Sequence, residues 1–171
     1  MTQELKSQNS NVSYSNQENP YKKLANVKGV WQTPFATQLT VRNFTFYSDQ
    51  PLDVGGKDKS PTPIELIAGA VNGCVTIVLE VVAKELDITL YDIKTESYAH
   101  IDTRGFLGIA DVPTHYSDYR LDIEITTDAN EEKLEKLKRV SAKRCPAVNL
   151  LRDAKVDLDI HWIINTQEKP I

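Results

Sequence analysis

Two cysteines are the residues of this chain best suited to chemistry, and each has different surroundings. Cys74 follows Asn72-Gly73 within an apolar segment, whereas Cys145 directly precedes Pro146, 71 residues further along. A thiol at the start of a helix can have a lowered pKa, because the first-turn amides and the helix dipole favour an anion. The neighbouring Lys143 and Arg144 add to this expectation for Cys145. Either cysteine could instead be a small buried hydrophobic residue.

Other catalytic patterns are weak or missing in the sequence. His100, His115 and His161 lie far apart, without the paired spacing of zinc ligands, so we expect no metal. The sequence contains no G-x-S-x-G, no G-x-G-x-x-G and no P-loop motif. We therefore expect no nucleotide cofactor and no serine hydrolase site.

The composition narrows the class of protein. The chain has 171 residues, 26% of them charged, with a formal charge of −4 and no long run of like charge. A nucleic-acid partner would require a basic patch, so we expect none. Two cysteines are too few for a disulfide-rich secreted scaffold, and residues 1–19 lack the apolar core of a secretory signal. The sequence predicts a cytoplasmic protein.

The positioning elements begin with one long helix. Thr62 and Glu65 form a capping box around Pro63, which predicts a helix from Pro63 to Leu86. Its uncharged stretch, residues 66–79, is shorter than the ~20 residues of a membrane span, so we expect a buried helix and no membrane. Because this helix is apolar on nearly every side, one subunit has difficulty covering it, which indicates a dimer.

Two glycines within this helix need an explanation. Gly69 and Gly73 are four residues apart, and each costs up to ~1 kcal/mol relative to alanine. Close approach of another backbone is one explanation. Access of a substrate to the adjacent Cys74 is the other.

The remaining pattern predicts an α+β fold with antiparallel sheets. Residues 1–20 are polar and read as a mobile N-terminal arm, and residues 21–171 as a single domain. We expect two or three strands within residues 25–47, a loop over residues 48–61, strands at residues 88–101, 116–127 and 156–164, a helix that Asp128 and Glu131 cap, and a short helix from Cys145-Pro146 through Ala154.

Four segments carry a resemblance to a known family. They are Asp53-Val54-Gly55-Gly56 through Pro61 and Pro63, the run from Ile64 to Cys74, the segment Asp102-Thr103-Arg104-Gly105-Phe106-Leu107-Gly108, and Cys145-Pro146-Ala147-Val148. In this order and spacing the chain resembles the OsmC/Ohr family of thiol-dependent peroxidases and their relatives.

The resemblance implies an intertwined homodimer, with long central helices enclosed by antiparallel sheets and active sites at the subunit interface. It also implies cysteine-dependent reduction of organic hydroperoxides. Cys74 would attack the O–O bond and become a sulfenic acid, and Cys145 would resolve that acid as a disulfide. A small hydrophobic peroxide and an external dithiol reductant would be the partners, without a bound cofactor.

The acid and the arginine that peroxidase members place near the thiolate match less well. The glutamate position holds Ile64, and Glu65, nine residues before Cys74, lies about 180° round the helix from it, so Glu65 is better explained as a cap. Arg42 is the candidate partner of the thiolate and Arg104 the second candidate. The alternative function is a non-catalytic protein that senses redox state or binds a hydrophobic small molecule.

Overall fold

The computed structural model describes residues 19–167 of the chain, which form two compact units. The N-terminal unit ends at Ser60 and the C-terminal unit begins at Pro61. The predicted arm, residues 1–20, lies outside the described residues except for its last two. That residues 21–171 fold as a single domain stays a prediction.

The N-terminal unit is a three-stranded antiparallel sheet in the order β1-β2-β3. Its strands confirm the prediction for residues 25–47 and are rich in β-branched and aromatic residues, which suit a pleated surface. They are β1 (Lys28–Gln32), β2 (Ala36–Val41) and β3 (Phe44–Ser48), followed by the short 3-10 helix η1 (Leu52–Val54).

A buried carboxylate organises the loop that follows β3. The side chain of Asp49 is 3% exposed and accepts hydrogen bonds from the backbone N–H groups of Gln50, Lys57 and Lys59. These hydrogen bonds hold the pKa of Asp49 below its ordinary value, and the bond from Gln50 has the largest effect. Gly56 passes so close to Gln50 that a Cβ would lie 1.8 Å from the Gln50 carbonyl oxygen. The loop thus has a fixed shape that requires both Asp49 and Gly56.

The long helix α1 (Pro63–Glu85) opens the C-terminal unit as predicted. The Thr62 side chain accepts from the Glu65 N–H, and the Glu65 carboxylate accepts from the Thr62 N–H, which completes the capping box. Leu86 caps the other end through its backbone N–H. Both predicted ends are confirmed to within one residue.

The second sheet has the order β4-β5-β6, with strands β4 (Leu90–Ile101), β5 (Tyr116–Thr127) and β6 (Asp157–Thr166). β4 and β5 are antiparallel as predicted, whereas β6 pairs with β5 in parallel, so this sheet is mixed. The two helices between β5 and β6 carry the chain back to the end of the sheet where β5 begins. A parallel pairing of the two strands requires such a crossover. The α+β class is confirmed, and the parallel pairing corrects the expectation of purely antiparallel sheets.

Three further helices belong to this unit: α2 (Thr103–Phe106), α3 (Glu131–Arg144) and α4 (Pro146–Asp153). The predicted cap of α3 was wrong by two residues. Asn130 accepts from the Lys133 N–H, while Asp128 accepts from the N–H of Thr89 instead. Asp128 and Asn130 both carry a side-chain oxygen that can cap a helix. Asp128 is engaged by Thr89, and Asn130 takes the capping position.

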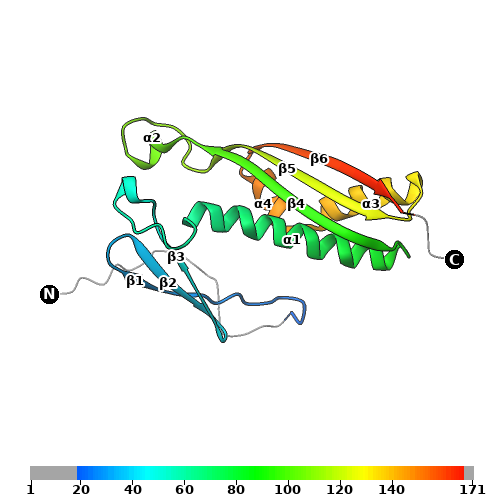
Figure 1. Cartoon of the computed structure of the whole chain (residues 1–171), viewed down its shortest axis with the longest axis horizontal. Helices are drawn as coiled ribbons and strands as arrows, with labels where there is room; N and C mark the ends of the chain where they lie inside the picture. Colours follow the sequence, from blue (N-terminus) through cyan, green and yellow to red (C-terminus); the bar gives the residue numbers. More distant parts are fainter. Residues whose placement is uncertain (1–18, 168–171) are drawn as a thin grey trace. The chain divides into compact units, whose positions relative to one another are not determined.

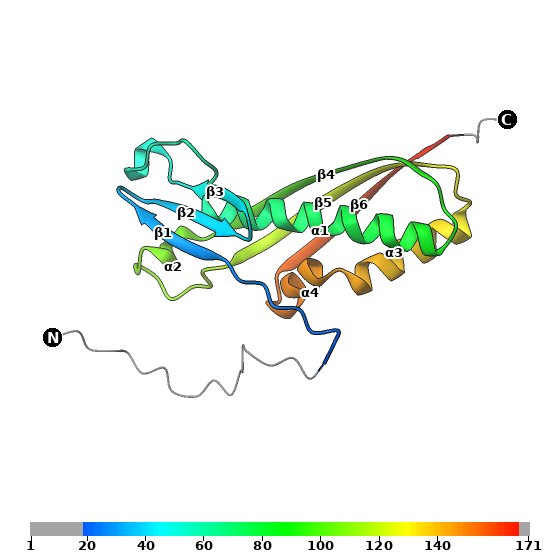
Figure 2. The same ribbon diagram turned by 90° about the horizontal axis from the view of Figure 1, so that it is seen from below.

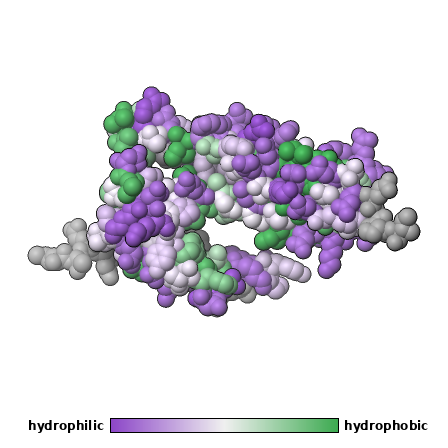
Figure 3. All heavy atoms as spheres, viewed as in Figure 1, coloured by the Kyte–Doolittle hydropathy of each residue, from purple (hydrophilic) through white to green (hydrophobic). Residues whose placement is uncertain are grey.

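The core lies between the second sheet and its helices, with α1 running along the sheet in Figures 1 and 2. Its fully buried side chains include Leu79 of α1, Leu121 and Ile125 of β5, and Leu137 of α3. Hydrophobic atoms also gather on the surface at the α2 segment in Figure 3, where Phe106, Leu107 and Ile109 are exposed.

Helix α1 is only partly buried among the described residues, and the expectation that a second subunit completes its burial stays a prediction. Among the described residues it is the one helix long and apolar enough to cross a membrane by length and composition. Core helices of soluble proteins meet the same criterion. The exposed apolar side chains of α1 include Ile67, Ile77 and Val81.

Candidate functional site

The structure brings Cys74 and Cys145 together. Their Sγ atoms lie 3.6 Å apart, and both cysteines are free thiols. A disulfide needs about 2.05 Å between sulfurs, so a shift of roughly 1.5 Å forms the bond. The two residues are therefore placed for reversible thiol–disulfide chemistry, across 71 residues of sequence.

The two thiols differ in exposure. Cys74 lies in the middle of α1 and is partly exposed, whereas Cys145 is 1% exposed at the junction of α3 and α4. Its extended backbone, φ −74° and ψ 113°, ends α3 and starts α4 at Pro146. A reagent from solvent reaches Cys74 first.

The pKa of Cys145 moves in the opposite direction from the prediction. Burial raises the pKa of this thiol, although the Val148 and Ala147 backbone N–H groups favour its thiolate. The Cys74 thiol beside it raises the pKa further. The helix N-terminus was located correctly, but the desolvation of a buried anion outweighs its dipole.

The cation next to Cys145 in sequence is engaged elsewhere. The Arg144 guanidinium makes two hydrogen bonds to Glu85 at the end of α1, at 2.5 and 3.0 Å. This ion pair ties α3 to α1 on the surface and lowers the pKa of Glu85. Arg144 thus stabilises the packing of the two helices that carry the cysteines.

An exposed apolar stripe runs beside Cys74. Ile67, Ala70, Ile77 and Val81 lie seven, four, three and seven residues from Cys74, so they share its side of the helix. The side chains of Ile67, Ile77 and Val81 are 51%, 63% and 44% exposed. We refer to these four residues as the α1 stripe. It gives the partly exposed thiol an apolar approach.

The two helix glycines open onto space. Within the described residues, a Cβ added at Gly69 or Gly73 would meet no atom within 4 Å. Within the C-terminal unit, close approach of another backbone is thus excluded as their explanation. Access to Cys74 by a substrate or by a second subunit remains.

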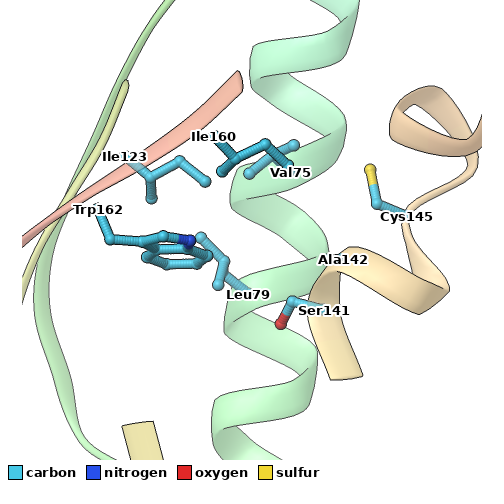
Figure 4. Close-up of a pocket in the computed structure, with 8 residues that line it drawn as sticks. All are labelled: Val75, Leu79, Ile123, Ser141, Ala142, Cys145, Ile160 and Trp162. Atoms are coloured by element: carbon cyan, nitrogen blue, oxygen red, sulfur yellow. The ribbon is translucent and has the colours of Figure 1, made fainter. Parts of the chain in front are cut away.

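A small cavity lies on the inner side of Cys145, between α1, α3 and the sheet (Figure 4). Its volume is about 10 Å³, roughly that of one water molecule. Besides Cys145, the lining is Val75, Leu79, Ile123, Ser141, Ala142, Ile160 and Trp162. The Ser141 hydroxyl is buried and has no hydrogen-bond partner among the described residues.

A chain of polar side chains that the sequence did not indicate fixes α1 against the sheet. The Tyr119 hydroxyl donates to Ser97 Oγ at 2.8 Å, and Ser97 donates to Asn72, two residues before Cys74. Tyr116 donates to the Ile64 carbonyl oxygen at 2.6 Å, and burial raises its pKa to about 12. Tyr119 shares the inward alternation of β5, which was the one available signal, whereas an irregularity in the β4–β5 pairing turns Tyr116, three residues earlier, to the same side.

The remaining predicted site residues have other partners in the structure. Glu65 caps α1, as expected, and Ile64 packs against the core. The Arg104 guanidinium binds Asp102 at 2.6 to 3.1 Å and lowers the pKa of Asp102 to about 2. Arg42 is exposed in the turn between β2 and β3, with its guanidinium 4.9 Å from the Phe44 ring centre. Its role beside Cys74 stays a prediction.

No group of three potential metal ligands occurs among residues 19–167. The paired sulfurs of Cys74 and Cys145 support one kind of chemistry directly. It is the reversible part of the cysteine oxidation ladder, from thiolate to sulfenic acid to disulfide.

Several solved structures share the fold of this chain. An OsmC-like protein from Mycoplasma pneumoniae has a TM-score of 0.70 and 18% identity, covering 85% of this chain and 99% of its own. The organic hydroperoxide resistance protein OsmC from Legionella pneumophila has a TM-score of 0.58 and 16% identity, covering 84% and 97%. OhrB, the organic hydroperoxide resistance protein of Bacillus subtilis, has a TM-score of 0.54 and 19% identity, covering 83% and 98%.

No curated protein sequence gives a significant match. The sequence model of the OsmC-like protein family, however, matches residues 56–161, which is more than half of the chain. The matched range includes both cysteines. This confirms the resemblance drawn from the sequence motifs. The chain belongs to the OsmC-like protein family.

Proposed function

We propose that this protein is a cysteine-dependent peroxidase that reduces organic hydroperoxides, with Cys74 as the attacking thiol and Cys145 as the resolving thiol. The observation that carries this proposal is the 3.6 Å separation of one partly exposed and one buried sulfur. The likeness of the fold to solved organic hydroperoxide resistance proteins supports it.

The reaction has two steps on this chain. The Cys74 thiolate attacks one peroxide oxygen, an S–O bond forms as the O–O bond breaks, and the alcohol leaves after taking a proton. Cys145 then attacks the sulfenic sulfur, a disulfide forms, and the sulfenic oxygen leaves as water. A dithiol reductant returns both cysteines to thiols.

The surroundings of Cys74 favour an apolar peroxide. The α1 stripe and the open space at Gly69 and Gly73 border the thiol. An alkyl or aryl group gains hydrophobic free energy there, at roughly 25 cal/mol per Å² buried, which hydrogen peroxide does not. We expect organic hydroperoxides to be preferred.

The exposed α1 stripe also supports a homodimer. Ile67 and Ile77 are more than half exposed on a helix of 23 residues, and exposed apolar surface of this kind marks an interface. We infer that a second copy covers much of α1 and borders the opening to Cys74. We place the protein in the cytoplasm, where reductants keep thiols reduced.

Peroxide consumption by variants tests the proposal. With a dithiol as electron donor, wild type consumes cumene hydroperoxide repeatedly and faster than it consumes hydrogen peroxide. Cys74→Ser is inactive, and Cys145→Ser keeps the first step, so its sulfenic acid can be trapped with a cyclic diketone. Arg42→Lys and Arg104→Lys compare the two candidate arginines with the charge retained.

A control keeps loss of activity separate from loss of fold. Cys74→Ala and Cys145→Ala are compared with wild type in circular dichroism and thermal unfolding. Turnover that persists in a folded Cys74→Ser variant removes this cysteine from the attacking role.

A second candidate function is a non-catalytic protein that senses redox state or binds an apolar small molecule. The specific observation in its favour is Ile64, which packs in the core where the resemblance predicts a glutamate. Its signature is thermal stabilisation by an apolar ligand without peroxide consumption. A ligand that raises the unfolding temperature of a Cys74→Ser, Cys145→Ser double variant supports this function independently of the thiols.

A further inference from the structure

The two sulfurs of the candidate site differ in what surrounds them, and this difference has a consequence for the reductive half of the cycle. Cys145 is 1% exposed, while Cys74 is partly exposed beside the α1 stripe. In a disulfide between them, only the sulfur of Cys74 adjoins solvent. A thiol attacks the sulfur it can reach, so access favours Cys74.

The groups behind Cys145 point to its role when the disulfide breaks. Cys145 is the N-cap residue of α4, and the backbone N–H groups of Ala147 and Val148 favour its thiolate. Within the described residues no side-chain hydrogen bond caps this helix. These amides are therefore available to a sulfur that gains negative charge. Because burial raises the pKa of Cys145 on balance, these amides offset part of the cost of forming a buried thiolate, and without them its departure would be slower.

We propose that the dithiol reductant attacks the sulfur of Cys74 and expels Cys145 as a thiolate that the first-turn amides of α4 stabilise. This inference rests on the proposed function for the formation of the disulfide in the cell. It adds which sulfur the reductant binds and which backbone groups assist.

The electrons and protons balance over two exchanges. A thiolate of the reductant bonds to Cys74 Sγ as the Cys74–Cys145 bond breaks, and the bonding pair stays on Cys145 Sγ, which then takes a proton. The second thiol of the reductant then attacks the reductant sulfur that is bonded to Cys74. A disulfide forms within the reductant, and Cys74 is released. The reductant loses two electrons and two protons and becomes a cyclic disulfide, while the protein returns to two thiols.

Mapping of the mixed disulfide tests the direction of attack. Protein oxidised to the disulfide with diamide is mixed briefly with glutathione, quenched in acid and alkylated with iodoacetamide. Peptide mass analysis is expected to find glutathione on Cys74 and the alkyl group on Cys145. Glutathione on Cys145 as the first adduct overturns the proposal.

Deletion of one backbone donor tests the role of α4. Ala147→Pro removes the N–H of the second residue of α4, in a first turn that tolerates proline, whereas Ala147→Ser retains it. We expect reduction of the disulfide by dithiothreitol to slow about tenfold in Ala147→Pro, the size expected for a hydrogen bond to a charged group, and to stay near wild type in Ala147→Ser. Equal rates in the two folded variants contradict the role of the amide.

These tests are independent of peroxidase activity, because diamide and not a peroxide makes the disulfide. A protein that fails to consume peroxides can still show the predicted adduct, which refutes the proposed function alone. A protein that consumes peroxides but carries the adduct on Cys145 refutes this inference alone. The mapping experiment uses wild type and stands even if Ala147→Pro does not fold.

Discussion

The Glu65 carboxylate closes on Thr62, the residue before its own helix. Its Oε2 accepts from the Thr62 N–H at 2.7 Å and from the Thr62 hydroxyl at 2.8 Å. These hydrogen bonds lower the pKa of Glu65, and the bond from the Thr62 backbone has the largest effect. The acid nearest in sequence to the position expected for a catalytic glutamate is thus occupied with holding the start of α1.

Replacement of Glu65 is predicted to reduce stability and leave chemistry intact. Glu65→Gln is expected to cost under about 1 kcal/mol of unfolding free energy, since an amide caps less well than a carboxylate. Because the folded-state pKa is lowered, the wild-type contribution is present above the ordinary pKa and lost as pH falls through the lowered one. Urea unfolding of both proteins at neutral and acid pH measures this. A large loss of peroxide turnover in folded Glu65→Gln would show a catalytic role instead.

The start of α1 and the span of β5 could be predicted because their signals are local. Proline after a capping threonine fixes the helix start at Pro63, and the alternation from Tyr119 to Thr126 identifies the strand β5. The direction of β6 could not be predicted, because a strand pattern does not state whether its neighbour runs parallel. The α2 turn after Asp102 was likewise visible only as a family motif.

Of the candidate site, the sequence named the two cysteines that the structure brings together, but it did not predict the electrostatics of Cys145. The pairing of Cys74 with Cys145 came from the resemblance, and the geometry agrees with it. The pKa of Cys145 was predicted in the wrong direction, because its burial depends on how α3, α4 and α1 pack. A helix N-terminus is a local feature, whereas desolvation is not.

The unequal exposure of the thiols predicts unequal alkylation. At pH 8, iodoacetamide is expected to modify Cys74 well before Cys145, because Cys145 is buried and its pKa is raised. The protonated Cys145 thiol stabilises the fold below its ordinary pKa, and this contribution is lost as pH rises through the raised value. Peptide mapping over time gives the two rates, with urea-unfolded protein as the control. Equal rates in the folded protein are incompatible with the burial described.

The unpaired hydroxyl of Ser141 predicts a stabilising substitution. A buried polar group without a partner costs about 1 to 3 kcal/mol, so Ser141→Ala is expected to be neutral or to raise the unfolding temperature. Thermal unfolding in parallel with Ser141→Cys, which keeps a weakly polar group of similar size, measures the effect. A loss of more than about 1 kcal/mol in Ser141→Ala would indicate a hydrogen-bonded water in the cavity.

The close passage of Gly56 predicts a strongly destabilising substitution. In Gly56→Ala the new Cβ would meet the backbone of Gln50, so the loop that Asp49 organises has to open. We expect a lower unfolding temperature and faster proteolysis within residues 49–60. Gly29→Ala is the matched control, since its nearest contact is a Thr37 side-chain methyl at 3.4 Å. Similar behaviour of the two variants would contradict the fixed shape of the loop.

The open space at Gly73 predicts separate effects on stability and on substrate choice. Gly73→Ala is expected to stabilise α1 by up to about 1 kcal/mol, because alanine is the better helix former. Gly73→Leu is expected to slow the reduction of cumene hydroperoxide more than that of hydrogen peroxide, because it narrows the approach to Cys74. Leucine at Lys84, an exposed residue near the end of α1, is the control for added bulk alone. An equal effect on both peroxides contradicts an apolar approach at this position.

The most direct test of the central claim is the mass and thiol content of reduced wild-type protein after one equivalent of cumene hydroperoxide. The account predicts rapid loss of both thiols together with two hydrogen atoms, and a Cys74–Cys145 peptide in the digest. If both thiols survive an excess of the peroxide in folded protein, the 3.6 Å pair of sulfurs is not a peroxidase site.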